Sequence, residues 1–238
     1  MSEIENIKKA AFIKSAELNE KDIELIKRFS LLNEIDTSKI FTFKVALCNN
    51  EIDRDFECFS KNSLEQLAVL FLGKTGIKDH SMKSNDQVAR LYKTEVVESE
   101  DLTSYGEKQA ELIGYAYMVR TKENASLIEE IELGIKKEVS VSCAIGSPIC
   151  SVCGKDLRKD RCEHRPGMEY DGKMCFVKLE NPKDAYEFSF VAVPAQIGAG
   201  TKKEFAVREP YPTAVEKEKS KKTIKSTIER AFLFKEEN

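Results

Sequence analysis

The chain has no tryptophan, only two histidines among its 238 residues, and no strong excess of either charge. Its formal net charge of −3 lacks the basic footprint expected of a nucleic-acid-binding domain. No apolar run reaches the roughly 18 residues that a membrane span needs. Residues 1–10 are charged and contain no signal-peptide core. We therefore expect a cytosolic protein without a membrane partner, and nucleic acid is disfavoured as a partner.

Seven cysteines are the least ordinary part of the composition. Because thiols stay reduced in a cytosol, these cysteines are not expected to form structural disulfides. Cys48, Cys58 and Cys143 occur in apolar or strand-like segments, where a buried and unreactive thiol is the expected state. The other four cysteines lie between residues 150 and 175 and need a separate explanation.

The hydrophobic pattern predicts a mainly β protein of the α+β class. Alternating apolar residues indicate strands at 41–47, 88–97, 112–120, 138–145, 174–179 and 186–193. Helical spacing indicates helices at 22–33, 64–72, 123–136 and 214–234, the last as a helix or tail. Because the helices do not alternate regularly with the strands, we expect a mostly antiparallel β-barrel with flanking helices rather than a doubly wound sheet.

This pattern also divides the chain. We expect a polar, partly helical N-terminal segment at 1–38 and a main domain at 39–200. A Cys/His-rich insertion interrupts the main domain at 146–172, and a charged C-terminal tail or helix follows at 201–238.

Two ligand pairs lie in the insertion. Cys150 and Cys153 form a CxxC pair on a turn that ends in Gly154, and Cys162 and His164 form a CxH pair further on. Three thiolates and one imidazole complete the closed tetrahedral set of a structural zinc site and leave no position for a catalytic water. The sequence therefore predicts a zinc knuckle with structural Zn²⁺. Free surface thiols and a redox CxxC pair are the alternatives.

The role of the knuckle is also constrained by its surroundings. Basic residues flank it, but aromatic residues for base stacking are nearly absent. Stabilisation of a long loop is therefore favoured over nucleic-acid binding. Cys175 lies close by in sequence and is a substitute ligand with a less natural spacing.

Assigning His164 to the knuckle leaves His80 as the one histidine for acid–base chemistry. Two further segments carry polar groups on strands. Ser140 alternates with Val139 and Val141, so it faces away from them. Glu187 lies near the start of the strand expected at 186–193.

Three blocks, taken in this order, resemble the prohead protease family of tailed phages, which shares its fold with the herpesvirus assembly proteases. They are GIKDHS at 76–81, GIKKEVSVSC at 134–143 and YEFSFVAVPA at 186–195. The acidic turn NNEIDRDFECF at 49–59 is also similar to the family. The resemblance covers residues 40–200 and implies an assemblin-like fold.

Carried over by position, the resemblance implies Ser140 as nucleophile, His80 as general base and Glu187 as the acid that orients the base. A serine hydroxyl becomes nucleophilic when an imidazole takes its proton, and a third group fixes the imidazole. The family has glycine two residues after the nucleophile, where this chain has Ser142, so Ser142 is an alternative nucleophile. Asp79 is a weaker candidate for the orienting acid.

The implied function is a serine endopeptidase that cleaves the scaffolding protein, scaffold-like arms of the major capsid protein and its own ends during capsid maturation. By the same resemblance, it acts inside the procapsid in the host bacterial cytoplasm, and a homodimer is an option. Two alternatives stay open. A non-enzymatic zinc-ribbon adaptor predicts that His80, Ser140 and Glu187 lie far apart. A catalytically inactive capsid-assembly factor predicts the same fold with a displaced or blocked serine.

Overall fold

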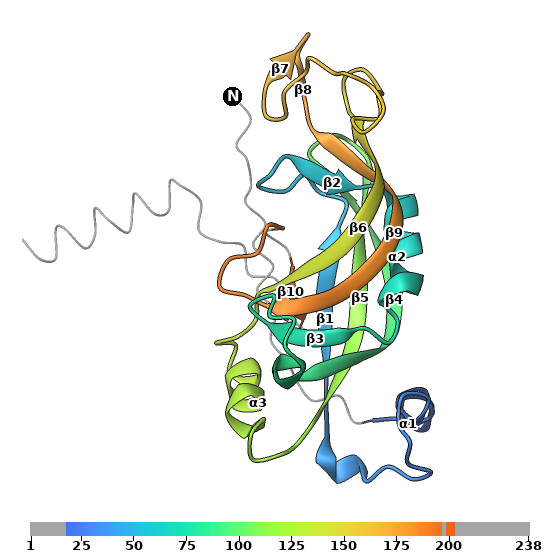
Figure 1. Ribbon diagram of the computed structural model, residues 1–238, viewed down its shortest axis with the longest axis vertical. Helices are drawn as coiled ribbons and strands as arrows, with labels where there is room; N and C mark the ends of the chain where they lie inside the picture. Colours follow the sequence, from blue (N-terminus) through green and yellow to red (C-terminus); the bar gives the residue numbers. More distant parts are fainter. Residues whose placement is uncertain (1–17, 197–198, 203–238) are drawn as a thin grey trace, which may run out of the picture. The chain divides into compact units, whose positions relative to one another are not determined.

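Long strands and short helices make up the computed structural model, which describes residues 18–196 and 199–202 (Figure 1). The helices are α1 (Glu20–Lys27), α2 (Lys61–Phe71) and α3 (Ala125–Glu132), with 3-10 turns η1 (Thr37–Lys39) and η2 (Ser84–Asp86). The strands are β1 (Ile40–Asn49), β2 (Glu57–Phe59), β3 (Thr75–Lys78), β4 (Ala89–Leu102), β5 (Lys108–Val119), β6 (Val139–Cys150), β7 (Glu169–Tyr170), β8 (Lys173–Met174), β9 (Val177–Phe190) and β10 (Gly200–Lys202). The helix or tail expected at 214–234 lies outside the described residues.

Eight of these strands form one mixed sheet. Its order is β10-β1-β5-β4-β3-β9-β2. β6 lies off this path and pairs with β9 along the whole of that strand, from Val177 to Phe190. Most neighbours are antiparallel, but β2 and β3 both run parallel to β9. β7 and β8 form a separate hairpin. Within the described residues, no helix has the length and apolar character that a membrane crossing requires.

The expected mainly β protein of the α+β class is confirmed, and most strand pairs are antiparallel as expected, but the described strands form an open sheet and not the expected barrel. In residues 18–196 and 199–202, β6 joins the sheet through β9 and β10 joins it through β1, so the ladder stays open between them. β6 does lie beside β1. Apolar side chains fill this space, since Val139 of β6 and Phe43 of β1 belong to one buried cluster.

The two strands expected at 174–179 and 186–193 are a single strand, β9. Between the two expected strands, Asn181 takes a positive φ of 57°. However, β6 keeps pairing with β9 on both sides of this point, and the register shifts between Ala144 and Ile145. A β-bulge therefore absorbs the break and lets the strand continue. The result is one long β6–β9 pair that runs from Cys150 at one end to Val139 at the other (Figure 1).

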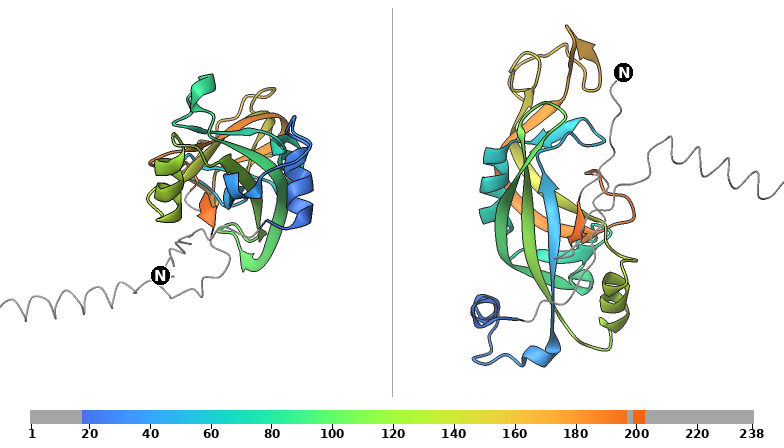
Figure 2. Two further views of the ribbon diagram at one scale, coloured as in Figure 1. Left: turned by 90° about the horizontal axis from the view of Figure 1, so that it is seen from below. Right: turned by 180° about the vertical axis from the view of Figure 1, so that it is seen from behind.

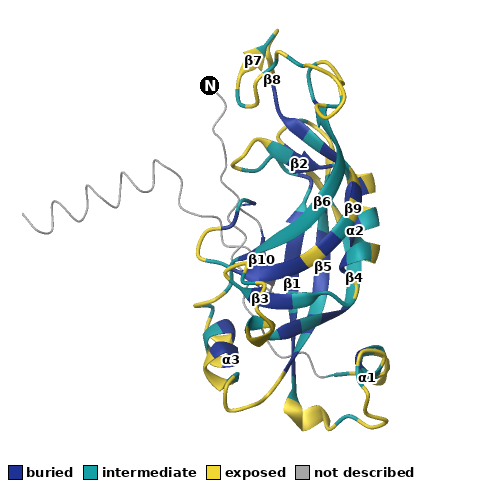
Figure 3. Ribbon diagram, in the orientation of Figure 1, coloured by how far each residue is buried: buried dark blue, intermediate teal, exposed yellow. Residues whose placement is uncertain are grey.

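Helix α2 packs on the sheet against β9, β4 and β5 (Figure 2). Leu64, Leu67 and Phe71 form its buried face, and Figure 3 shows how this side of the helix and the central strands share the core. The helix begins after Ser60, whose Oγ accepts the N–H of Ser63 at 3.1 Å, an ordinary N-cap. It ends before Gly73, whose φ of 81° suits glycine.

The expected domain limits stay predictions. α1 lies in the expected N-terminal segment and packs against β4. α1 and α3 are shorter than the helices expected at 22–33 and 123–136, and α3 is followed by Gly134 with φ 75°.

Phenylalanines of β9 fix which way that strand faces. Phe43 of β1 lies 6.5 Å from Phe188 and 6.0 Å from Phe190 between ring centroids. Because side chains alternate along a strand, Glu187 and Ser189 point to the opposite face of β9. The core packing of the two phenylalanines therefore sets the polar face on which the candidate site is built.

Candidate functional site

A histidine and a buried carboxylate meet just beyond the end of β3. His80 Nδ1 lies 2.9 Å from Glu187 Oε1. The His80 side chain is 41% exposed, whereas that of Glu187 is 1% exposed. Glu187 Oε2 is buried and has no hydrogen-bond partner within the described residues. Because a buried carboxylate is costly to leave unpaired, this arrangement favours the contact with His80 and keeps the imidazole open to solvent.

The backbone that carries His80 is strained. Asp79 and His80 have φ values of 50° and 52°, and such left-handed residues other than glycine cost about 1–3 kcal/mol each. Two hydrogen bonds to β9 hold the turn: Asp79 N–H donates to Phe190 O at 3.0 Å, and His80 N–H donates to Ser189 Oγ at 2.8 Å. The strained turn therefore aims the imidazole at Glu187.

The two candidate serines occupy successive outward-facing positions of β6. Ser142 lies opposite Glu187 in the antiparallel pair, and Ser140 lies opposite Ser189. Directly paired residues share a face of the sheet, so both serines lie on the face that carries Glu187. Ser142 Oγ is 3.3 Å from His80 Nδ1. Ser140 is half-buried and makes no hydrogen bond to His80 in the described part of the chain.

The structure therefore brings together His80, Glu187 and Ser142, and it places Ser140 two residue pairs further along. The contact of Ser142 with Nδ1 has a chemical consequence. A neutral imidazole carries one N–H and one lone pair. If Nδ1 donates its hydrogen to Glu187, it has no lone pair with which to take the hydroxyl proton of Ser142. The free base is then Nε2, and the nucleophile must approach Nε2.

Neighbouring groups compete poorly for these roles. Asp79 is exposed, and the carboxylate that contacts His80 is that of Glu187. Cys143 follows Ser142, but burial, with a smaller contribution from the charge of Glu57, raises the pKa of its thiol to about 11. Within the described residues no hydrogen bond joins its sulfur to His80, whereas Ser142 Oγ lies 3.3 Å from His80 Nδ1. The serines are therefore the nucleophile candidates on this part of β6.

The interpretation of the isolated cysteines as buried thiols is confirmed for two of them. Cys48 is 1% exposed and Cys58 is 0% exposed, whereas Cys143 is half-buried. Burial raises the pKa of Cys58 to about 12 and raises that of Cys48 as well.

Ser189, to which the sequence analysis assigned no role, also belongs to the site. Ser189 accepts the N–H of His80 and is 0% exposed. The alternation of side chains already placed it on the face of Glu187, so a signal was present in the sequence. What the sequence did not contain was the parallel pairing of β3 with β9, which brings residues 79–80 next to Ser189.

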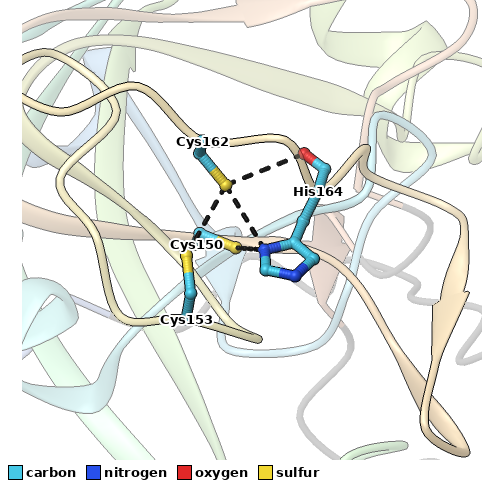
Figure 4. Close-up of side chains that lie close together, drawn as sticks. All are labelled: Cys150, Cys153, Cys162 and His164. Atoms are coloured by element: carbon cyan, nitrogen blue, oxygen red, sulfur yellow. Dashed lines mark hydrogen bonds between the residues drawn. The ribbon is translucent and has the colours of Figure 1, made fainter.

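The four predicted metal ligands gather at the far end of the β6–β9 pair. Cys150 ends β6, and the other three ligands lie on the loop that follows (Figure 4). Their ligand atoms all lie within 4.8 Å of one another. The cluster of Cys150, Cys153, Cys162 and His164 can hold a metal ion such as zinc.

The distances in this cluster fit a tetrahedral site. With Zn–S near 2.3 Å and Zn–N near 2.0–2.1 Å, the edges of a tetrahedron are about 3.8 Å between sulfurs and about 3.5 Å between sulfur and nitrogen. Cys153 Sγ and Cys162 Sγ are 3.6 Å apart. His164 Nδ1 lies 3.8 Å from Cys150 Sγ and 3.5 Å from Cys162 Sγ. These three distances are close to tetrahedral edges, and all four ligand atoms lie within 4.8 Å of one another, so a small adjustment would complete a zinc site.

Local geometry supports this ligand set. Burial raises the pKa of Cys150, but hydrogen bonds from the backbone N–H groups of Cys153 and Val152, and from the thiols of Cys153 and Cys162, outweigh it and lower the pKa overall. A lower pKa favours the thiolate that binds metal. The pKa of Cys162 is raised by burial and by its interactions with the thiols of Cys153 and Cys150. Cys175 is buried and is not one of the four clustered residues, but it lies beside them: burial and its interaction with Cys150 raise the pKa of its thiol to about 11.

The knuckle is anchored to the rest of the chain and to its own hairpin. Gly167 approaches the ring of Phe56 so closely that an added Cβ would lie 2.8 Å from it. The His164 ring packs edge-on against Tyr170, with centroids 4.6 Å apart, and the Tyr170 hydroxyl accepts the N–H of Arg165 at 3.0 Å. These contacts fix the orientation of the imidazole ligand.

Comparison of the chain with protein-family models, with curated proteins and with solved structures found no match.

Proposed function

We propose that the chain is a serine endopeptidase in which His80 is the general base and Glu187 orients it. The observation that carries the proposal is the 2.9 Å contact between an exposed imidazole and a buried carboxylate, beside two serines on the same face of the sheet. An acid, a base and a hydroxyl in this order are the groups that acyl transfer requires.

In the proposed mechanism, Ser140 attacks the scissile carbonyl and His80 Nε2 takes its proton. Nδ1–H remains bonded to Glu187, which stabilises the imidazolium that forms. His80 then protonates the leaving amine, and water hydrolyses the acyl-enzyme. Ser140 is preferred over Ser142 because Ser142 contacts Nδ1, the nitrogen already engaged by Glu187.

The substrate assignment rests on the resemblance to the phage prohead proteases. The blocks around His80, Ser140 and Glu187 support a capsid-maturation enzyme that cleaves scaffolding protein, arms of the major capsid protein and its own ends. It would act inside the procapsid in the host bacterial cytoplasm, with a homodimer as an option.

The knuckle has a structural role in this proposal. Its four ligands complete a tetrahedral Zn²⁺ site, so no coordination position remains for a reacting water. Cys150 and Ser142 lie on the same strand but at different ends of the β6–β9 pair. Zinc would therefore stabilise the loop without taking part in the chemistry.

Two alternatives make different predictions. An adaptor without activity needs no contact between His80 and Glu187, so that contact argues against it. An inactive assembly factor fits if Ser142 blocks the base, because its hydroxyl occupies space beside Nδ1. Only activity separates this second alternative from the enzyme.

The decisive experiment is co-expression with the neighbouring scaffold and capsid proteins, read by intact mass. Wild type is compared with Ser140→Ala and Ser142→Ala. Ser60→Ala is the control, because Ser60 is a hydrogen-bonded serine that lies at the start of α2. Cleavage lost only in Ser140→Ala supports the proposal. Cleavage lost only in Ser142→Ala moves the nucleophile, and no cleavage with any variant favours the inactive factor.

A further inference from the structure

The hydroxyl of Ser189 is the side-chain partner of the His80 backbone. Its Oγ accepts the His80 N–H at 2.8 Å, and the side chain is 0% exposed. In the part of the chain that the structure describes, Ser189 contacts the His80 backbone and not the imidazole, which Glu187 holds. It therefore acts on the backbone of the strained turn rather than on the reacting atoms.

The turn needs such a partner. Asp79 and His80 are both left-handed, with φ values of 50° and 52°, and conformations of this kind persist only where the surroundings hold them. Phe190 O anchors the N–H of Asp79, and that acceptor belongs to the backbone and survives any substitution. The acceptor for the His80 N–H is a side chain, so a single substitution removes this backbone anchor.

The arrangement along β9 links the two anchors of His80. Glu187 and Ser189 are separated by one residue and face the same way, so one strand holds the imidazole by Glu187 and the backbone by Ser189. Phe188 lies between them and is 0% exposed in the core. Because Phe188 fixes the rotation of the strand, the two polar groups keep a constant spacing.

We infer that Ser189 is a positioning residue that sets the direction of the His80 imidazole toward Glu187 and the strand serines. Its importance for rate rests on the proposed serine-hydrolase function. Its effect on the orientation of His80 does not, and that effect is measured separately.

The first test reads the orientation directly. The chain has two histidines, so selective ¹⁵N labelling of histidine gives ring signals from His80 and His164 alone. Zinc removal identifies those of His164. In wild type we expect His80 as the Nδ1–H tautomer. In Ser189→Ala we expect a mixture of the two His80 tautomers. Ser189→Thr keeps the hydroxyl and should show the wild-type signals. Ser60→Ala should also leave the His80 signals unchanged.

The second test reads reactivity with a fluorophosphonate probe. The serine oxygen bonds to phosphorus, fluoride leaves, and His80 takes the hydroxyl proton. Misplacement of a catalytic group by about 1 Å can cost about 100-fold, so we expect Ser189→Ala to slow labelling by at least about tenfold. Ser189→Thr should restore the rate, and the pH dependence of labelling should change in Ser189→Ala alone.

The outcomes are separable. An unchanged His80 tautomer and an unchanged labelling rate in Ser189→Ala overturn the inference. A second outcome is that Ser189→Ala changes the His80 tautomer although the wild-type protein does not react with the fluorophosphonate. That outcome supports the positioning role and rejects the proposed function. If Ser189→Ala fails to fold, amide exchange in wild type decides. Protection of the His80 N–H comparable to that of Asp79 supports the bond, and rapid exchange at His80 rejects it.

Discussion

His80 reaches Glu187 across 107 residues of sequence, and Nδ1 lies 2.9 Å from Oε1. The contact depends on β3, which runs parallel to β9 with Lys78 opposite Phe190. The chain leaves β3 at this point and turns back through two left-handed residues. The four-residue strand β3 therefore places His80 next to Glu187.

Replacement of that acid should disable the base while leaving the fold intact. Glu187→Gln keeps the shape of the side chain but removes the charge that stabilises an imidazolium. We expect the rate of fluorophosphonate labelling to fall by about 10²- to 10⁴-fold, the range in which triad acids act, with the circular dichroism spectrum unchanged.

The control for this substitution lies on the same strand. Glu180 accepts hydrogen bonds from Ser60 and Ser63 at the start of α2. Glu180→Gln should lower stability slightly and leave labelling unchanged. Equal labelling rates in Glu187→Gln and Glu180→Gln would remove Glu187 from the mechanism.

Much of the strand content was predictable because it follows from local alternation. β1, β4 and β5 lie where period-two patterns predicted them, although β4 continues past the expected residue 97 to Leu102 and β5 begins at Lys108, before the expected residue 112. The metal cluster was predictable for a different reason. Its ligands lie within 15 consecutive residues, and their spacing alone constrains the geometry.

The rest depends on long-range pairing. β2 and β3 are three and four residues long, too short to show a period. Their parallel pairing with β9 could not be inferred locally. Whether the sheet is open or closed likewise depends on which strand edges pair. The sequence does not show this, and the expected barrel was wrong for that reason. Which serine meets Nδ1 follows from the register of Ser142 with Glu187, another long-range property.

Replacing Ser142 with glycine, the residue that prohead proteases have at the matching position, tests which of the two serines is the nucleophile. Ser142 Oγ lies 3.3 Å from the nitrogen that Glu187 engages, so its hydroxyl competes with Glu187 for Nδ1–H. We expect Ser142→Gly and Ser142→Ala to label at the wild-type rate or faster, and Ser140→Ala not to label. Peptide mapping of labelled wild type should locate the probe on Ser140, and a probe found on Ser142 contradicts the assignment.

Metal removal should destabilise the chain without touching the catalytic groups. We expect purified protein to contain one zinc ion per cluster and Cys162→Ser to contain almost none. Each kcal/mol of lost stability lowers Tm by about 2–4 °C in a domain of this size, and we expect a loss of at least ~5 °C. Cys48→Ala is the control, because Cys48 is a buried thiol of β1, and Cys175→Ala is a separate test, because Cys175 interacts with Cys150. Loss of zinc in Cys175→Ala would revise the ligand set.

A buried thiol should make the fold sensitive to alkaline pH. Cys58 is 0% exposed, and burial raises the pKa of its thiol from 9.0 to about 12. Between these values the unfolded chain loses a proton that the folded chain keeps. The folded state therefore binds more protons, and stability falls as pH rises. The contribution is complete below pH 9 and is lost progressively toward pH 12.

We therefore expect the urea midpoint of wild type to fall between pH 8 and about pH 10.5 under reducing conditions, and to fall less in Cys58→Ala. Val45→Ala is the matched control, because Val45 is equally buried and does not titrate. It should be less stable at every pH by the about 1–3 kcal/mol typical of a truncated core side chain, with the pH dependence of wild type. A pH dependence in Cys58→Ala as steep as that of wild type would show that the alkaline loss arises from other groups.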